Sequence, residues 1–164
     1  MDEAIIKWDN LRRVLGEYGE ALRNEYQDNL IRDGKIATGE LLNSVEYTVE
    51  ADDRSITLSL KLQDYYKWVE EGRQPGRFPP VDKILEWIRV KPILPDERNG
   101  KLPTEQQLAF LIGRKIAEEG IEGGHQLARA RTTLAEEWEA KIDEAIALDV
   151  KDALDVIFSA WFSE

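Results

Sequence analysis

The stretch "VEYTVEADDRSITLSLKL", residues 45–62, contains the clearest structural pattern in the chain. Apolar and polar residues alternate up to Glu50, and they alternate again from Ile56 onward. A period of two places the apolar side chains on one face of a β-strand. The letters "ADDRS" between the two halves are typical of a turn. The stretch therefore predicts an antiparallel β-hairpin with one apolar face, over about residues 44–51 and 55–62.

The predicted hairpin needs a covering layer, because two strands alone are only marginally stable in water. We find no other convincing strand pattern in the sequence. The cover is then expected from helices, from a third strand or from a strand of another subunit. Strands of this length leave long open edges, which favour pairing with another chain.

Both ends of the chain are typical of long helices. Leucine and aromatic residues recur at steps of three and four from Trp8 onward, which predicts a helix over residues 3–33 that ends at Gly34. A second apolar repeat starts at Thr132 and predicts a helix that bends or restarts near Asp149 and continues to the C-terminus.

Shorter helices are expected between these two. One over residues 64–71 ends at Gly72, and one over residues 82–91 is capped by Asp82. Thr104 and Gln107 have the spacing of a capping box, which predicts a helix that ends at Gly120. Residues 121–131 are expected to be irregular.

The predicted fold class is α+β, with the hairpin packed against several helices. One domain, residues 1–164, is expected to contain the N-terminal helix, a core over residues 34–131 and an acidic helical segment over residues 132–164. The length of 164 residues suffices for one domain with a core. The sequence contains no run of 18 apolar residues, so no membrane span is expected. The polar N-terminus is not typical of a secretory signal.

The net charge of −11 argues against nucleic-acid binding as the main function, because phosphate contacts need Lys and Arg. The charge is uneven, since residues 132–164 hold nine Asp or Glu and two Lys, a net of −7. This acidic end is either a solvated helix face or a surface that repels DNA or meets a basic partner.

Candidates for catalysis are weak. The chain has no cysteine, which excludes disulfides, thiolate zinc sites and a cysteine nucleophile. Its one histidine, His125, is flanked by glycines. Asp96, Glu139 and Lys141 imitate the motif of metal-dependent nucleases, but Glu139 and Lys141 are expected on different faces of a helix. We therefore expect no enzyme activity and no cofactor or metal.

The stretch "YYKWVEEGRQPGRFPP", residues 65–80, combines aromatic residues, arginines, glycines and prolines in a way that a simple connector does not need. Prolines lower the entropy lost when a loop is ordered, which suits a docking loop. We expect Gly72→Val or Phe78→Asp to spare the fold of the monomer and to weaken assembly. The candidate subunit or partner interface, completed by two aromatic residues at the C-terminus, is: Trp68, Glu70, Glu71, Gly72, Arg73, Pro75, Arg77, Phe78, Pro79, Pro80, Trp161 and Phe162.

Two of these roles are more specific. Glu70 and Glu71 are expected to pair with Arg73 or Arg77 of an adjacent subunit. Trp161 and Phe162 are expected to dock either on their own domain or on a neighbouring subunit, because a terminal turn with two large aromatic side chains frays unless it docks.

Four features in order resemble the tail-completion, or head–tail joining, proteins of tailed bacteriophages. They are a long N-terminal helix leading to "TGELLNSVEYTVE", the stretch "YYKWVEEGRQPGRFPP", the pair "VDKILEWIRVK" and "LAFLIGRKIAEEGIEGG", and a long C-terminal helix. The resemblance covers roughly residues 1–150. The chain departs from the family pattern in "EEGRQPGR" and in its acidic, aromatic C-terminus.

The resemblance implies a structural virion protein that is assembled in the cytoplasm of a bacterial host. Such a protein forms a homo-oligomeric ring, six- or twelve-fold, in the phage neck or at the tail top. The implied partners are portal-side and tail-tube proteins, with DNA passing through the channel without specific binding. Two alternatives stay open: a metal-dependent nuclease or other phage hydrolase, and an acidic soluble protein that binds and inhibits a basic host protein.

Overall fold

The computed structural model of the protein describes residues 6–52, 55–91, 93 and 102–162. The contacts of the chain gather into two compact units. Unit 1 comprises the chain up to Asn29, Ser44–Leu62 and the chain from Gln126 onward, and unit 2 comprises Leu30–Asn43 and Gln63–His125. The expectation that the two units belong to a single domain stays a prediction.

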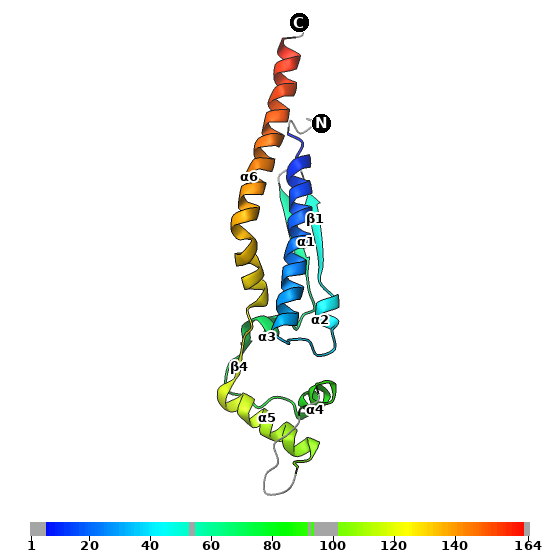
Figure 1. The fold of residues 1–164 in the computed structure, drawn as a ribbon, viewed down its shortest axis with the longest axis vertical. Helices are drawn as coiled ribbons and strands as arrows, with labels where there is room; N and C mark the ends of the chain where they lie inside the picture. Colours follow the sequence, from blue (N-terminus) through cyan, green and yellow to red (C-terminus); the bar gives the residue numbers. More distant parts are fainter. Residues whose placement is uncertain (1–5, 53–54, 92, 94–101, 163–164) are drawn as a thin grey trace. The chain divides into compact units, whose positions relative to one another are not determined.

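Unit 1 confirms the predicted α+β class, with two long helices and a hairpin (Figure 1). Its elements are α1 (Asp9–Arg32), which continues into unit 2, β1 (Glu46–Ala51), β2 (Ile56–Lys61) and α6 (Gln126–Trp161). Residues 6–8 are not helical, so the predicted start of the first helix was too early, and residues 3–5 lie outside the described part.

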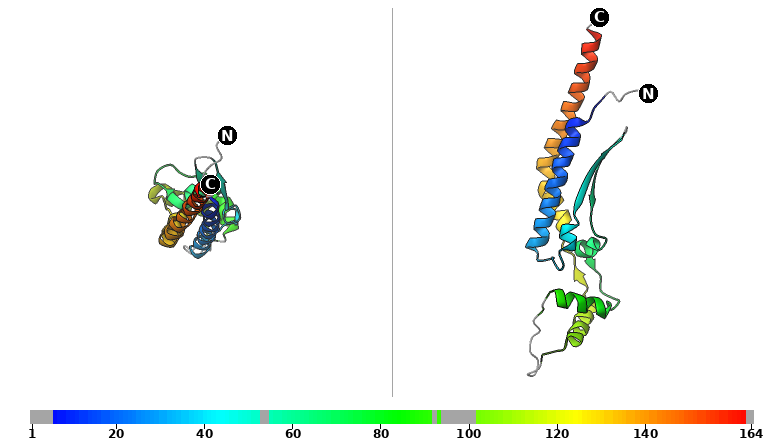
Figure 2. Two further views of the ribbon diagram at one scale, coloured as in Figure 1. Left: turned by 90° about the horizontal axis from the view of Figure 1, so that it is seen from above. Right: turned by 90° about the vertical axis from the view of Figure 1, so that its right-hand side faces the viewer.

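The hairpin lies against one side of α1, as Figure 2 shows. Its register runs from the pair Glu46 and Lys61 to the pair Ala51 and Ile56. A Cβ atom built on Gly19 of α1 would lie 2.5 Å from the ring of Tyr47 and 2.9 Å from Leu58 Cδ1. The glycine therefore lets α1 come close to the apolar face of the hairpin. In the described part of the chain β1 and β2 pair only with each other, so both outer edges are open.

Helix α6 packs against α1 through a second apolar layer. Val14, Trp138 and Ala145 are buried there, and Tyr18 packs against them with its ring centroid 5.4 Å from that of Trp138. The helix begins at Gln126, six residues before the expected start at Thr132. Buried Asn29 of α1 holds this helix start in place, because its Nδ2 donates a hydrogen bond to the Gln126 carbonyl oxygen at 3.1 Å.

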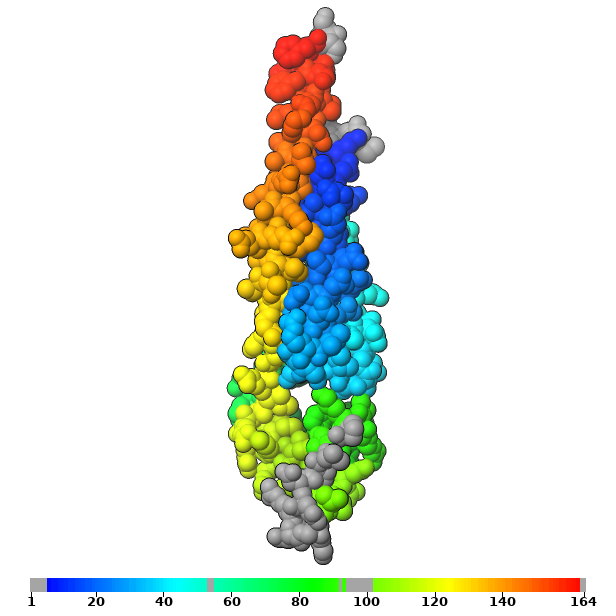
Figure 3. Space-filling view, viewed as in Figure 1, coloured from blue at the N-terminus to red at the C-terminus, as the bar shows by residue number. Residues whose placement is uncertain are grey.

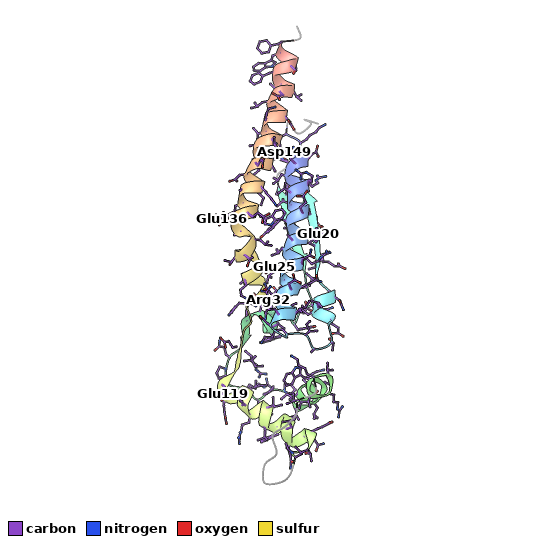
Figure 4. All side chains as sticks on the ribbon, in the orientation of Figure 1. Glu20, Glu25, Arg32, Glu119, Glu136 and Asp149 are labelled. Atoms are coloured by element: carbon purple, nitrogen blue, oxygen red, sulfur yellow. The ribbon has the colours of Figure 1, made fainter. Side chains whose placement is uncertain are left out.

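Asp149 joins α6 to the first turn of α1 (Figure 4). Its Oδ1 accepts hydrogen bonds from the Asn10 amide and from Asn10 Nδ2, at 3.0 and 2.9 Å, and its Oδ2 accepts one from the Leu11 amide at 2.9 Å. The first amides of a helix have no partner within that helix, and a carboxylate also suits the positive end of the helix dipole. Asp149 thus supplies a cap for α1 from another helix.

The expected restart near Asp149 is wrong, because α6 runs without interruption to Trp161. Aspartate usually weakens a helix interior, since its side chain competes for nearby backbone groups. Here the Asp149 carboxylate is buried and its acceptors are used by α1, so this competition is removed.

Unit 2 is built from short elements. They are α2 (Glu40–Asn43), α3 (Tyr66–Glu71), β3 (Gly72–Arg73), α4 (Val81–Val90), α5 (Glu105–Glu119) and β4 (Ile121–Glu122). Ile84 and Ile88 of α4 pack on Ala109 of α5 to form its apolar core. The antiparallel pair of β3 and β4 was not expected, because two-residue strands are too short to show a periodic pattern.

The helix ends of unit 2 test three predicted caps. The capping box is confirmed, since the Gln107 amide donates to Thr104 Oγ1 at 3.2 Å and the Thr104 amide donates to Gln107 Oε1 at 3.0 Å. Gly120 ends α5 as expected. The predicted Asp82 cap is wrong, because Pro80 is the N-cap residue and Asp82 lies in the first turn of α4.

We predict that Asp149→Ala lowers the free energy of unfolding by about 1–3 kcal/mol, because it leaves two amides of α1 and the Asn10 side chain without their acceptor. Urea unfolding followed by circular dichroism measures the change. Asp143→Ala removes an exposed carboxylate from the same helix and should change stability by less than about 0.5 kcal/mol. Equal effects of the two variants would contradict the capping role.

Two glycines of α1 should respond to alanine with opposite signs. A Cβ atom on Gly16 meets nothing within 4 Å, so Gly16→Ala should raise stability by about 0.5–1 kcal/mol through helix propensity. Gly19→Ala should lower it by about 1–3 kcal/mol, because the methyl group collides with Tyr47 and Leu58. Thermal unfolding of both variants beside the wild type checks the pair, and stabilisation by Gly19→Ala would refute the packing of the hairpin.

Candidate functional site

The stretch from Tyr65 to Pro80 lies inside unit 2 and is held there by backbone contacts. Helix α3 ends at Gly72, whose φ is 76°, and the next residues form β3 against β4. A Cβ atom on Gly72 would lie 2.1 Å from the Ile121 carbonyl oxygen, and one on Gly123 would lie 2.3 Å from the Glu70 carbonyl oxygen. The two backbones therefore cross at a distance that only glycine allows.

Phe78 anchors the same stretch to α5 of its own chain. Its ring would lie 2.5 Å from a Cβ atom on Gly113, and its centroid is 5.5 Å from that of Phe110. Pro79 beside it is buried. The expectation that Gly72→Val and Phe78→Asp spare the monomer is wrong, because both side chains would disrupt contacts within unit 2.

The remaining interface candidates differ in their exposure. Trp68 is 66% exposed, and Glu70 and Arg73 are partly buried. Arg73 donates from a guanidinium nitrogen to the Arg77 carbonyl oxygen at 2.6 Å, which ties the loop to itself. The other exposed candidates of this stretch are Glu71, Pro75, Arg77 and Pro80. The contact of these candidates with another subunit stays a prediction. So does the pairing of Glu70 and Glu71 with the arginines of an adjacent subunit.

The C-terminal end of α6 carries an exposed row of large apolar side chains. Leu154, Phe158, Trp161 and Phe162 recur at steps of three and four, so they share one side of the helix, and we name them the C-terminal stripe. Trp161 is 72% exposed and Phe162 is 85% exposed. Trp161 and Phe162 therefore lie open to solvent in the single chain. The prediction that they dock on their own domain or on a neighbouring subunit leaves the neighbouring subunit as the surface that could cover them.

The C-terminal stripe keeps helical geometry to its last residue. The Phe162 amide still donates to the Phe158 carbonyl oxygen at 3.1 Å, which continues the helical pattern past Trp161. The rings of Phe158 and Trp161 meet edge to face, with centroids 6.2 Å apart. Figure 3 shows this end of α6, in red, extending past α1, in blue. The stripe follows Asp149, which caps the start of α1, and this explains why α1 does not cover it.

Unit 2 contains a pocket of about 380 Å³, which we name the unit 2 pocket. Leu41 and Leu42 form one wall, Tyr65 and Val69 a second and Trp87 of α4 a third. No single stretch of sequence indicates this pocket, because its walls come from segments that lie far apart in the chain.

Two lysines, Lys35 and Lys91, also line the unit 2 pocket. Among the described residues that line it, none is acidic. Lys91 Nζ donates to the Gly34 carbonyl oxygen. This bond uses one of its three donors, and its acceptor is a neutral carbonyl group. The pocket is therefore apolar inside and carries two positive charges.

Two exposed ion pairs account for the resolved pKa shifts. Lys151 Nζ donates to Asp155 Oδ2 at 2.7 Å, and this hydrogen bond, with the attraction to the Asp155 charge, raises the pKa of Lys151. The hydrogen bond and charge of Glu86 raise the pKa of Lys83 in the same way. Exposed pairs within one helix contribute little to stability.

The nuclease-like residues do not form a site in the described part of the chain. Lys141 Nζ donates to Glu137 Oε1 at 2.6 Å and lies 4.1 Å from the centroid of the Trp138 ring, while Glu139 is exposed. Asp96 lies outside the described residues. Over residues 6–52, 55–91, 93 and 102–162, no three His, Cys, Asp or Glu side chains come together as metal ligands.

Comparisons of the chain with models of protein families, with curated proteins and with solved structures find no match. Among the helices that the structure describes, none combines the length and the apolar content that crossing a membrane requires.

The position of Phe78 predicts a loss of stability rather than of assembly alone. Phe78→Ala should lower the free energy of unfolding by about 1–3 kcal/mol, because it removes the ring that packs on Gly113 and Phe110. Trp68→Ala removes an exposed aromatic side chain from the same stretch and should change the free energy of unfolding by less than about 1 kcal/mol. Thermal unfolding compares the two, and a Phe78 variant as stable as the Trp68 variant would contradict the anchor.

Proposed function

We propose that the chain is a structural protein of a tailed-phage virion, a ring-forming subunit of the neck or tail top. In this function it joins the portal or head side to the tail around the DNA channel. The observation that carries the proposal is the C-terminal stripe, a helical apolar surface exposed on the single chain. Large exposed apolar patches on a soluble fold mark sites of protein association.

The hairpin supports the same function independently. Both of its outer edges are open in the described part of the chain, and open edges are a template for pairing with another chain. Trp68 adds an exposed aromatic side chain on unit 2. Association through several surfaces of one chain is what a ring between two other layers requires.

The sequence resemblance supports the location in the virion. The motifs that resemble the head–tail joining family fall on α2 and β1, on α3 with the loop after it, and on α4 and α5. We further propose that the exposed carboxylates of α6, such as Glu136 and Glu139, help to keep DNA from adhering in the channel. An outward-facing α6 in the assembled ring would contradict this last point.

Native mass spectrometry and electron microscopy test the proposal directly. The chain is examined alone and mixed with portal-side and tail-tube proteins of the same phage, because the ring can depend on a partner. We expect rings of six or twelve subunits in at least one of these samples. A chain that stays monomeric and binds neither partner would refute the proposal.

Two other results would point to the alternatives. Metal-dependent hydrolysis that is lost in Asp96→Ala would indicate an enzyme. Tight binding of a basic host protein at low salt by a monomer or dimer would indicate an inhibitor.

A further inference from the structure

We propose that the C-terminal stripe of one copy inserts into the unit 2 pocket of the next copy. The inference rests on the proposed function and deepens it, because it names the contact that joins neighbouring subunits. The occupant of the pocket is a second copy of this chain, and its binding element is the end of α6.

The stripe has the chemistry of a helix that binds in a groove. Such helices present apolar anchors at steps of three, four and seven residues, the spacing shared by Leu154, Phe158 and Trp161. Trp161 is the type of residue that most often dominates interface energies, and large rigid side chains lose little entropy when they bind. Phe158 and Trp161 are already in edge-to-face contact in the single chain, so the two rings form one apolar surface.

The pocket has the matching shape and polarity. A volume of about 380 Å³ lies in the range of sites that hold organic groups, and it has room for an aromatic side chain. Trp87 and Tyr65 on its walls are themselves exposed aromatic residues. Burying Trp161 against them removes apolar surface from water on both partners at once.

The charges of the two surfaces are complementary. The segment that carries the stripe, residues 132–164, has a net charge of −7. Near the stripe, Asp155 is paired with Lys151, and Asp152 adds one further negative charge. The pocket lining contributes Lys35 and Lys91 and no acid. This arrangement steers the acidic helix end toward the pocket and disfavours contact between two helix ends, because like charges repel.

The contact joins two different surfaces and is therefore heterologous. A heterologous contact repeated from copy to copy closes into a ring when the rotation allows it. Each copy then donates one stripe and receives one, so no stripe and no pocket stays empty in a closed ring. A two-fold dimer would instead need one surface that is complementary to itself.

Disulfide trapping between two single-cysteine variants tests the contact, since the chain has no cysteine of its own. Phe162→Cys places a thiol at the end of the stripe and leaves Phe158 and Trp161 intact. Ala37→Cys places one on the exposed lining of the pocket without removing an aromatic side chain. Any bond between the two variants joins different copies, because each chain carries one thiol.

The matched control replaces Phe162→Cys by Val156→Cys. Val156 is 70% exposed near the same end of α6, but it lies two residues from Leu154 and Phe158 and thus on another side of the helix. We expect the Phe162→Cys and Ala37→Cys mixture to form cross-linked dimer about tenfold faster than the control mixture. Equal rates, at the highest concentration at which the chain stays soluble, would overturn the inference.

A second experiment separates this inference from the proposed function. Trp161→Ala combined with Phe162→Ala should raise the Kd of self-association by about tenfold or more, whereas Val156→Ala should change it by less than about twofold. Circular dichroism confirms folding of both variants, as expected for exposed positions. Unchanged rings in the double variant overturn the stripe-to-pocket contact and leave the ring proposal standing. A wild-type chain that forms no ring, alone or with its partners, overturns the ring proposal itself, and the cross-linking rates then decide the contact alone.

Discussion

The close approach of α1 to the hairpin at Gly19 is the contact on which unit 1 depends. Two strands do not persist in water unless a layer covers their apolar face, and α1 is that layer. The opposite side of α1 packs on α6 through Tyr18 and Trp138, so one helix holds both other layers. A side chain at position 19 would push the hairpin away and expose its apolar face.

Asp149 determines where the paired part of α6 ends. Its carboxylate accepts hydrogen bonds from the first amides of α1, so the two helices are aligned at that point and α6 continues past the start of α1. The same residue that stabilises the helix pair thereby leaves the C-terminal stripe uncovered by α1. Stability in unit 1 and the surface offered for assembly thus follow from one buried carboxylate.

The loop after α3 shows how a sequence feature that suggests docking can serve the fold instead. Gly72 at the end of α3 and Gly123 after β4 allow the two backbones to cross closely, and Phe78 fills the space over Gly113. What α3 and this loop leave for a partner is mainly Trp68 on the helix and a few charged or proline residues at the surface of the loop. The aromatic end of α6, far away in the sequence, has more exposed apolar surface.

The sequence by itself determined the class of the fold, the hairpin, the long helices and the Thr104 capping box, because each depends on neighbours along the chain. It also singled out Trp161 and Phe162 as unusual for a chain end. Only the tertiary structure decided that Asp149 caps α1, that Phe78 packs on Gly113 and Phe110 of its own chain, and that a pocket with two lysines exists in unit 2. These features join residues that are far apart in the chain, and no local period or spacing encodes which distant side chains meet.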